Sequence, residues 1–257
     1  MSKYFDLTGL KGLVVGIADS NSIAYGCAQM LSEMGAKLAI TYLNDKAKIY
    51  TEPLAKEVKA DLFLPCNVED ETQINGVFDS IKNKWDKLDF VIHAIAFAPK
   101  SDLQGRMVDS SLAGFTQSMN ISCHSFARMA KLAEPLMVSG GTLITMSYLG
   151  AKKVIPSYGM MGVVKAALEA TVSYMAHDLG PKNIRVHAIS PGPIMTRAAS
   201  GIAGFDKLIE EGNAKSPLKQ QITIQDVGLV ACSLISEAGK CMTGNVTYVD
   251  RGYNIMG

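Results

Sequence analysis

Short apolar runs alternate with helical patterns along the whole chain, and this alternation limits the folds that are open to it. The expected strands are residues 12–18, 37–42, 61–65, 88–94, 142–147, 184–189 and 245–249. Helical periodicity fills the intervals between them, beginning at residues 23–34. Because parallel strands need long crossovers, usually helical ones, this order predicts a parallel sheet.

The same pattern predicts one α/β domain over residues 1–257. Right-handed crossovers place helices on both faces of such a sheet, so we expect a doubly wound, Rossmann-like fold. A chain of 257 residues with 48% hydrophobic and 19% charged residues is able to fill that core. A segment rich in Gly, Ala and Ser around residues 192–217 departs from the pattern, and we expect it to form a lid over the site.

Charge and cysteine content narrow the function classes. A formal net charge of +1 gives no general attraction to nucleic acid, and no apolar run is long enough to predict a membrane span. The five cysteines form no CxxC motif and no cluster with histidine, so we expect free buried thiols, no metal site and a cytoplasmic protein. Neither nucleic acid nor membrane is expected as a partner.

The turn after the first expected strand suits a dinucleotide. Gly16 would let the backbone approach a pyrophosphate, and Ser22 is placed to cap a helix that begins at Ile23, whose N-terminus attracts anions. The turn lacks a GxGxxG motif. An ordinary capped helix after a glycine turn therefore remains the alternative for this segment alone.

The end of the second expected strand bears on the choice of nucleotide. Asn44 or Asp45 would meet a free ribose hydroxyl, whereas Lys46 or Lys48 would meet a 2′-phosphate. We expect NAD in preference, with NADP as the alternative.

Two tyrosines and a lysine follow the fifth expected strand. Tyr148 stands at its end, and Tyr158 and Lys165 fall in a helix expected over residues 157–179. Seven positions apart, they would share one face with roughly 10 Å of axial separation. Gly162 occupies the position one turn after Tyr158, so no lysine is expected to lie close enough to ionise the phenol directly. The set suits reduction by a nicotinamide cofactor.

Several motifs in the same order resemble those of bacterial enoyl-acyl-carrier-protein reductase, a divergent branch of the short-chain dehydrogenases. They are Gly16 with Ser-Ile-Ala-Tyr-Gly at 22–26, His-Ala-Ile-Ala-Phe-Ala-Pro at 93–99, Ser-Tyr-Leu-Gly-Ala at 147–151, the Tyr-x6-Lys pair, and Gly-Pro-Ile-Met-Thr at 192–196. The resemblance spans essentially the whole chain. It implies a homotetramer that reduces the trans-2 double bond of a fatty acyl thioester on an acyl carrier protein, with NADH or NADPH, in type II fatty acid synthesis.

The chemistry of that reaction suggests a role for each residue. Hydride delivery to the β-carbon pushes negative charge onto the thioester oxygen, where a phenolic donor stabilises it, and Tyr158 is the first candidate for that donor. Lys165 is placed to bind the cofactor ribose and add positive charge near the nicotinamide. Tyr148 would line the substrate pocket or assist proton delivery, and no histidine is given a catalytic role.

Further contacts are implied by the resemblance, position by position. They are Asn67 and Val68 at the adenine, Leu43 near the adenosine ribose, Ile95 beside the nicotinamide, Ile194 and Thr196 over the carboxamide and pyrophosphate, and Ala98 in the substrate pocket. Three positions depart from the family pattern. Leu43 replaces a polar or basic residue, Asn67 replaces Asp, and Ala94 replaces Ser, and these changes bear on nucleotide preference.

Two other functions compete with enoyl thioester reduction. One is an NAD(P)-dependent carbonyl or alcohol oxidoreductase of the short-chain family with unusual lysine spacing. The other is a dinucleotide-binding regulatory module without catalysis, against which the intact Tyr148, Tyr158 and Lys165 argue.

Overall fold

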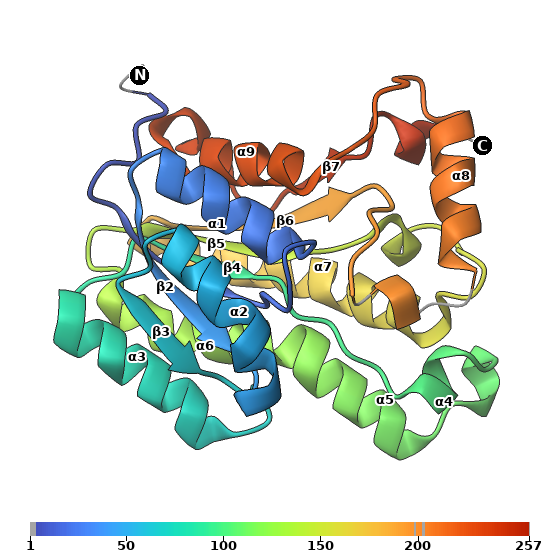
Figure 1. Cartoon of the computed structure of the whole chain (residues 1–257), viewed down its shortest axis with the longest axis horizontal. Coiled ribbons are helices and arrows are strands. Elements are labelled where there is room, and N and C mark those ends of the chain that lie inside the picture. Colours follow the sequence, from blue (N-terminus) through green and yellow to red (C-terminus); the bar gives the residue numbers. More distant parts are fainter. Residues whose placement is uncertain (1–3, 198, 202–203, 257) are drawn as a thin grey trace.

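The computed structural model describes residues 4–197, 199–201 and 204–256. Within these residues, seven parallel strands form one sheet of order β3-β2-β1-β4-β5-β6-β7 (Figure 1). The strands are β1 (Lys11–Val15), β2 (Lys37–Tyr42), β3 (Leu62–Pro65), β4 (Phe90–His93), β5 (Gly141–Met146), β6 (Ile184–Pro191) and β7 (Val246–Val249). All seven expected strands are present, which confirms the predicted parallel sheet.

Helices cover both faces of the sheet (Figure 1). One face packs against α1 (Ile23–Glu33), α2 (Asp45–Glu57) and α9 (Ile224–Ile235), and the other against α3 (Glu71–Trp85), α6 (Ser125–Ala133) and α7 (Gly159–Leu179). The other α-helices of the described residues are α4 (Lys100–Leu103), α5 (Leu112–Met119) and α8 (Phe205–Lys215). The doubly wound α/β fold is therefore as expected.

Strand β1 shows how the sequence feeds both cores. Leu13 and Val15 pack into the core beneath α3, α6 and α7, while Val14 between them packs into the core beneath α1 and α9. Successive side chains of a strand point to opposite faces, and a parallel sheet is buried on both. A continuous apolar run is the result.

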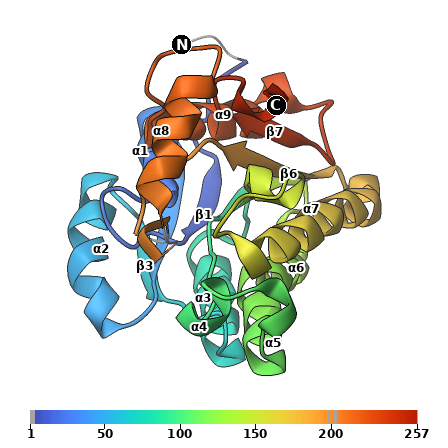
Figure 2. The ribbon, with the colours of Figure 1, turned by 90° about the vertical axis from the view of Figure 1, so that its right-hand side faces the viewer.

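The strand order reverses between β1 and β4, which lie side by side with β2 and β3 on one flank and β5 to β7 on the other. In open α/β sheets, ligands bind outside the carboxyl ends of the strands at such a point. Figure 2 looks at this end of the molecule, with α8 above and α4 below. The fold thus directs attention to the residues that follow β1, β4, β5 and β6.

Several predicted strand ends differ from the structure by one to three residues, and β4 begins at Phe90 instead of residue 88. Strand β1 ends at Val15 instead of residue 18, because Gly16 has a φ of +111° that leaves the extended region. Strand β6 runs to Pro191 instead of residue 189, because it pairs with β7 as far as the register Pro191↔Val249.

The segment expected to form a lid contains a short 3₁₀ turn, η6 (Ala199–Gly201), and helix α8. Phe205 and Leu208 of α8 pack with Ala199 into a small separate cluster. Three residues of the expected lid, Ala198, Ile202 and Ala203, lie outside the described residues, as do residues 1–3 and 257 of the expected domain.

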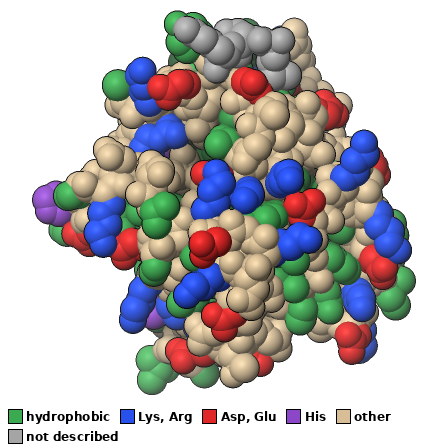
Figure 3. Space-filling model, turned by 90° about the vertical axis from the view of Figure 1, so that its left-hand side faces the viewer, with side chains coloured by type: hydrophobic (Ala, Val, Ile, Leu, Met, Phe, Trp, Pro, Cys, Tyr) green, Lys and Arg blue, Asp and Glu red, His purple; other side chains and the backbone are tan. Residues whose placement is uncertain are grey.

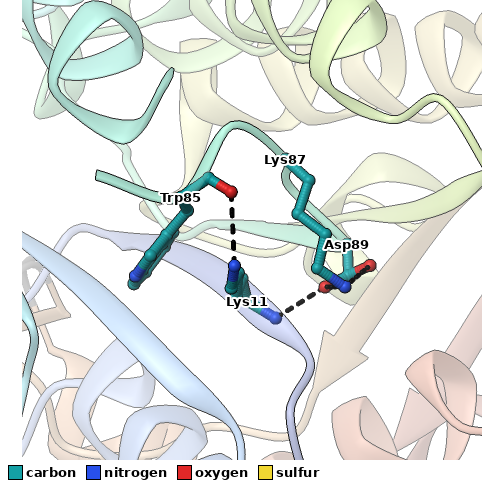
Figure 4. Close-up of polar contacts among 4 residues, drawn as sticks. All are labelled: Lys11, Trp85, Lys87 and Asp89. Carbon is teal, nitrogen blue, oxygen red and sulfur yellow. Dashed lines mark hydrogen bonds and ion pairs between the residues drawn. The ribbon is translucent and has the colours of Figure 1, made fainter. Parts of the chain in front are cut away.

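A polar cluster joins β1 to the start of β4 at the amino end of the sheet (Figure 4). The Lys11 amide donates to Asp89 Oδ2 at 2.7 Å, and the Asp89 amide donates to the Lys11 carbonyl at the same distance. Lys11 Nζ also donates to the Trp85 carbonyl at 3.2 Å, and Lys87 pairs with Asp89 at 3.1 Å. This cluster therefore lies at the opposite end of the strands from the carboxyl ends where ligands of such folds bind.

The face shown in Figure 3 lies opposite the α8 end, and Lys and Arg side chains there are interspersed with Asp and Glu. Among the described residues, no helix has the length and apolar character needed to cross a membrane. Four cysteines are buried thiols, but Cys241 is exposed, so the expectation of buried thiols was wrong at that position.

Replacing Asp89 with Ala should lower the free energy of unfolding by about 1–3 kcal/mol, because the amide of Lys11 loses its acceptor in a partly buried setting. Lys87→Ala is the matched control, since it removes only a half-exposed ion pair and should change stability by less than about 1 kcal/mol. Urea unfolding of the two variants beside the parent protein measures both. Equal losses of unfolding free energy in the two variants would show that the hydrogen bond from the Lys11 amide to Asp89 contributes nothing to stability.

Candidate active site

A pocket of about 380 Å³ lies at the carboxyl ends of the central strands. Its lining is mostly apolar and comes from the segments that follow β1, β4, β5 and β6, from α7, and from the segment that leads to α8. Seven of the residues expected to hold the cofactor line it, namely Gly16, Ser22, Ile23, Ile95, Lys165, Ile194 and Thr196. Segments far apart in the chain therefore meet where the sheet topology predicts.

The turn between β1 and α1 is built around Gly16. A Cβ added at Gly16 would lie 2.2 Å from the Ala94 carbonyl oxygen, so the turn passes directly over the end of β4. Ser22 occupies the N-cap position, but its side chain does not cap the helix as expected. Its Oγ instead accepts from the amides of Ala18 and Asp19, at 2.9 and 3.0 Å, and holds the turn closed. The first turn of α1 is left without a side-chain acceptor, which suits an anion.

Tyr148 and Tyr158 contact each other in the pocket wall, with ring centroids 4.9 Å apart and an edge-on geometry. Burial raises the pKa of Tyr148 to about 12 and holds the pKa of Tyr158 well above its usual range. Both side chains are therefore neutral phenols at physiological pH, able to donate a proton. The hydroxyl of Tyr148 is buried and has no hydrogen-bond partner within the described part of the chain.

Tyr158 immediately precedes α7 instead of lying inside it, as the expected helix over residues 157–179 implied. Ser157 has a φ of +65°, in the left-handed region, and the helix begins at Gly159. The Tyr158 ring packs against the 3₁₀ turn η4 (Leu149–Ala151), where a Cβ added at Gly150 would lie 2.3 Å from its Cδ1. The glycine therefore makes room for the tyrosine.

Gly162, the position one turn into the helix after Tyr158, also packs on η4. A Cβ added there would lie 2.9 Å from the Gly150 carbonyl oxygen. A lysine in that place would push the turn away from α7. The wider Tyr-x6-Lys spacing and the close approach of η4 are thus one structural feature.

Lys165 lies on α7 with only 4% of its surface exposed, and it lines the same pocket as the tyrosines. Its Nζ donates to the Met146 carbonyl at the end of β5, at 2.6 Å. Burial lowers the pKa of Lys165 to about 8, against the opposing influence of Cys123 and Glu169. A lysine that titrates so near neutrality, beside two phenols in a cleft, is typical of a functional site.

Three residues expected at the cofactor do not line this pocket. Leu43 directly follows β2 and is 54% exposed, while Asn67 and Val68 follow β3. The Asn67 side-chain oxygen accepts from the Glu69 amide at 3.0 Å, and Val68 is buried. Because β2 adjoins β1 and β3 lies beyond β2, all three residues lie at the carboxyl edge of the sheet, beyond Gly16.

Ala98, expected at the substrate, lines the pocket next to Phe97. Ser122 fixes this stretch, since its Oγ accepts from the Phe97 amide at 2.8 Å and donates to the Phe97 carbonyl at 3.0 Å. Ser122 belongs to a π-helical turn, η2 (Asn120–His124), that joins α5 to α6. Met161 on α7 and Phe205 on α8 add apolar surface on the other sides.

His93, at the end of β4, is fully buried and bonded at both ring nitrogens. Nδ1 lies 3.0 Å from Thr145 Oγ1, and Nε2 lies 2.7 Å from Ser125 Oγ. Burial, and then Lys165, lower the pKa of His93 to about 3, so the ring stays neutral. It joins β4, β5 and α6 within the core.

Comparison with known proteins agrees with this site. The family model described as enoyl-(acyl carrier protein) reductase matches residues 16–254. The chain belongs to the enoyl-acyl-carrier-protein reductase family. It is 47% identical over 249 residues to the enoyl-[acyl-carrier-protein] reductase [NADH] 2 of Rhizobium meliloti, covering 97% of this chain and 93% of that one. The corresponding NADH reductase of Rickettsia typhi is 46% identical over 251 residues, covering 98% and 96%.

Solved structures of this reductase family superpose closely on the chain. The enoyl reductase of Anaplasma phagocytophilum, solved in complex with NAD, has a TM-score of 0.94 at 45% identity and covers 98% of this chain and 96% of its own. The Bacillus cereus reductase, solved with NADP⁺ and an indole naphthyridinone, has a TM-score of 0.95 at 39% identity and covers 98% and 99%.

Sequence reasoning about this reductase missed two residues that support the site. The sequence gives Gly150 no role beyond its place in a motif, and it gives no role to Glu169, which is buried one turn beyond Lys165. A glycine three residues after a strand and a glutamate inside an amphipathic helix carry no distinctive signal. Their roles follow from which neighbours they contact.

Replacing Gly150 with Ala should displace the Tyr158 ring, because the added methyl group overlaps its edge. A misplacement of about 1 Å at a reacting group costs roughly 100-fold in rate, so we expect a fall of that order in kcat for NADH-dependent reduction of an enoyl thioester. Gly180→Ala is the control, because nothing lies within 4 Å of an added Cβ there. Steady-state kinetics that leave both variants equal to the parent would show that Tyr158 tolerates the displacement.

Proposed function

We propose that this protein reduces the trans-2 double bond of an enoyl thioester carried by an acyl carrier protein, with NADH as hydride donor, in type II fatty acid biosynthesis. The observation that carries the proposal is the pocket itself, where Tyr148, Tyr158 and Lys165 face a largely apolar cavity at the switch point of the sheet. Two neutral phenols are proton donors, and the apolar walls suit an acyl chain.

The residues present fit a nicotinamide dinucleotide. The first turn of α1, from Ile23, offers amides that no side chain caps, and Gly16 brings the backbone close to the same place. We assign the pyrophosphate to this turn, with Thr196 beside it and Ile194 over the nicotinamide. Lys165 would hold the ribose hydroxyls next to the nicotinamide, with Ile95 packing alongside.

The adenosine would extend along the edge formed by the ends of β2 and β3. We assign its adenine to Asn67 and Val68, since the Asn67 oxygen that accepts from Glu69 retains a second lone pair. Leu43 would face the adenosine ribose with an apolar side chain. Lys48 lies over the Tyr42 ring at 5.5 Å, engaged in a cation–π contact instead of facing an open phosphate site. This arrangement favours NADH, with NADPH as the alternative donor.

When bound, the nicotinamide supplies the hydride that goes to the β-carbon of the enoyl thioester. Negative charge then gathers on the thioester oxygen, and the Tyr158 hydroxyl would donate a hydrogen bond to it. The Lys165 ammonium lowers the energy of the same charge through space. Tyr148, whose buried hydroxyl is unpaired in the described structure, would line the acyl pocket and assist in delivering the proton.

We take residues 192–217 to be the lid over the substrate. Ala199 and Phe205 line the pocket. Their small cluster packs against Ile155, which also packs against the core beneath α3, α6 and α7. Gln104, after α4, donates to the Gly201 carbonyl at 3.3 Å, so the two sides of the pocket mouth touch. Such a cover would shelter an acyl chain from water.

We also propose that the chain works as a single domain over residues 1–257, in a cytoplasmic homotetramer. Large apolar side chains are exposed on α5 and α7, among them Leu112 at 82% and Tyr174 at 75%. Neighbouring subunits would cover these side chains.

The deciding experiment follows the absorbance of the reduced nicotinamide. Purified protein is mixed with a trans-2-enoyl thioester and either NADH or NADPH, beside a ketone control. Oxidation of NADH with the enoyl substrate alone supports the proposal, and the paired traces identify the cofactor. Turnover of the ketone alone would favour a carbonyl reductase, and cofactor binding without turnover would favour a regulatory module.

The Tyr158→Phe variant should lose about 100-fold or more in kcat while NADH binds as before, because only the proton donor is removed. Tyr174→Phe is the control, because it removes a tyrosine hydroxyl from α7 that does not line the pocket. Turnover and NADH fluorescence titration measure the two quantities. Full turnover in Tyr158→Phe would exclude this phenol as the main donor.

Replacing Lys165 with Ala should weaken NADH binding by about tenfold to 100-fold, the worth of a charge-assisted hydrogen bond to the ribose. Lys182→Ala is the control, because Lys182 lies beyond the far end of α7 and pairs there with Glu134 at 2.7 Å. The readout is the dissociation constant for NADH. An unchanged constant in the Lys165 variant would contradict its assignment to cofactor binding.

A further inference from the structure

A buried carboxylate lies one helical turn beyond Lys165. Glu169 is 4% exposed, and its Oε1 accepts from Ser147 Oγ at 2.6 Å. Its Oε2 makes no hydrogen bond but lies 3.2 Å from Nζ of Lys152, whose side chain is 60% exposed. A carboxylate so buried is costly unless it is paired, and these contacts supply the pairing.

The contacts of Glu169 converge on the strand end that builds the active site. Ser147 stands between Met146, whose carbonyl accepts from Lys165, and Tyr148. Helix α7 therefore holds consecutive residues of this strand end from two successive turns, one through Lys165 and one through Glu169. Ser147 also lines the pocket, and its amide donates to the Ile189 carbonyl at 2.7 Å.

We propose that Glu169 is a positioning residue for the reductase: its carboxylate anchors Ser147, and with it Tyr148, to α7, and it provides the counter-charge for the Lys165 ammonium. The inference rests on the proposed function of the site. It assigns to the pocket a charged residue that touches neither substrate nor cofactor.

Glu169 lies four positions after Lys165 on α7, so the two side chains share one face of the helix, and within the described part of the chain Glu169 is the carboxylate that acts on Lys165. Two other titratable groups of the described residues interact electrostatically with Lys165. They are His93 from β4, which stays neutral, and the Cys123 thiol from η2. Glu169 itself faces Lys152 from the turn after η4 and Tyr248 from β7, and it adds to the burial that raises the pKa of Tyr248. The pKa of Lys165, already lowered to about 8 by burial, would fall further without this negative charge.

The test uses two substitutions that separate charge from anchoring. Glu169→Gln keeps an acceptor for Ser147 but removes the charge, so NADH binding should weaken at a lower pH than in the parent protein. We expect a loss on the order of tenfold at about pH 8.5 and none at about pH 6.5, since one pKa unit is tenfold. Glu169→Asp keeps the charge but is one methylene shorter, so the pH profile should stay while kcat falls about tenfold.

Controls keep each part falsifiable. Glu134→Gln removes a half-buried carboxylate paired with Lys182 and should alter neither profile nor kcat. Ser147→Ala breaks the anchor without touching the charge, and should lower kcat at an unchanged pH midpoint even where a Glu169 variant fails to fold. A Glu169→Gln profile that superimposes on the parent's would overturn the charge role. Parental kcat in both Glu169→Asp and Ser147→Ala would overturn the anchoring role.

The two proposals fail in different ways. NADH binding is followed by fluorescence without any enoyl substrate, so the pH profile stands apart from catalysis. A parent protein that binds NADH but does not oxidise it with an enoyl thioester would overturn the proposed function. A parent protein that is active, with Glu169 variants that match it in profile and rate, would overturn this inference alone.

Discussion

The hydrogen bond from the buried Lys165 ammonium to the Met146 carbonyl ties helix α7 to the end of strand β5. Everything that faces the pocket on this side depends on that attachment. Tyr148 follows the strand end, and Tyr158 precedes the helix, so the edge-on contact between their rings is set by how closely the two elements approach. An ammonium is a costly way to join two elements in a core, and its use here marks a site built for charge.

The packing of η4 onto α7 explains the Tyr-x6-Lys spacing in physical terms. Gly150 and Gly162 allow the 3₁₀ turn to lie against the helix, and the Tyr158 ring fills the space beside Gly150. A lysine at position 162 would abolish that contact. The lysine is displaced by one turn, to a place from which it reaches the strand carbonyl instead of the phenol. Burial then raises the pKa of Tyr158 and keeps the phenol neutral, as a proton donor to developing negative charge should be.

Much of this architecture could be predicted from the sequence, because it depends on periodicity. Alternating apolar runs indicated all seven strands, and β2 begins and ends at the residues expected. The end of β1 before Gly16 and the start of α7 after Ser157 were not predicted. Both are set by positive φ angles, which depend on the surrounding chain. Partners distant in sequence were missed as well. Ser147 and Glu169 are 22 positions apart, and nothing local to either residue predicts their bond.

The buried lysine also links the stability of the fold to its ligand. Because the pKa of Lys165 drops from its ordinary 10.5 to about 8, the unfolded chain binds more protons than the folded one between these values. The folded state therefore bears a penalty for the buried ammonium that is fully present below about pH 8 and is relieved as pH rises toward 10.5. An anionic dinucleotide placed beside Lys165 favours the charged form, so its binding offsets this penalty most where the lysine is protonated. Glu169 acts in the same direction before any ligand arrives. The free protein can then hold an ammonium ready in an apolar pocket, at a cost that binding later recovers.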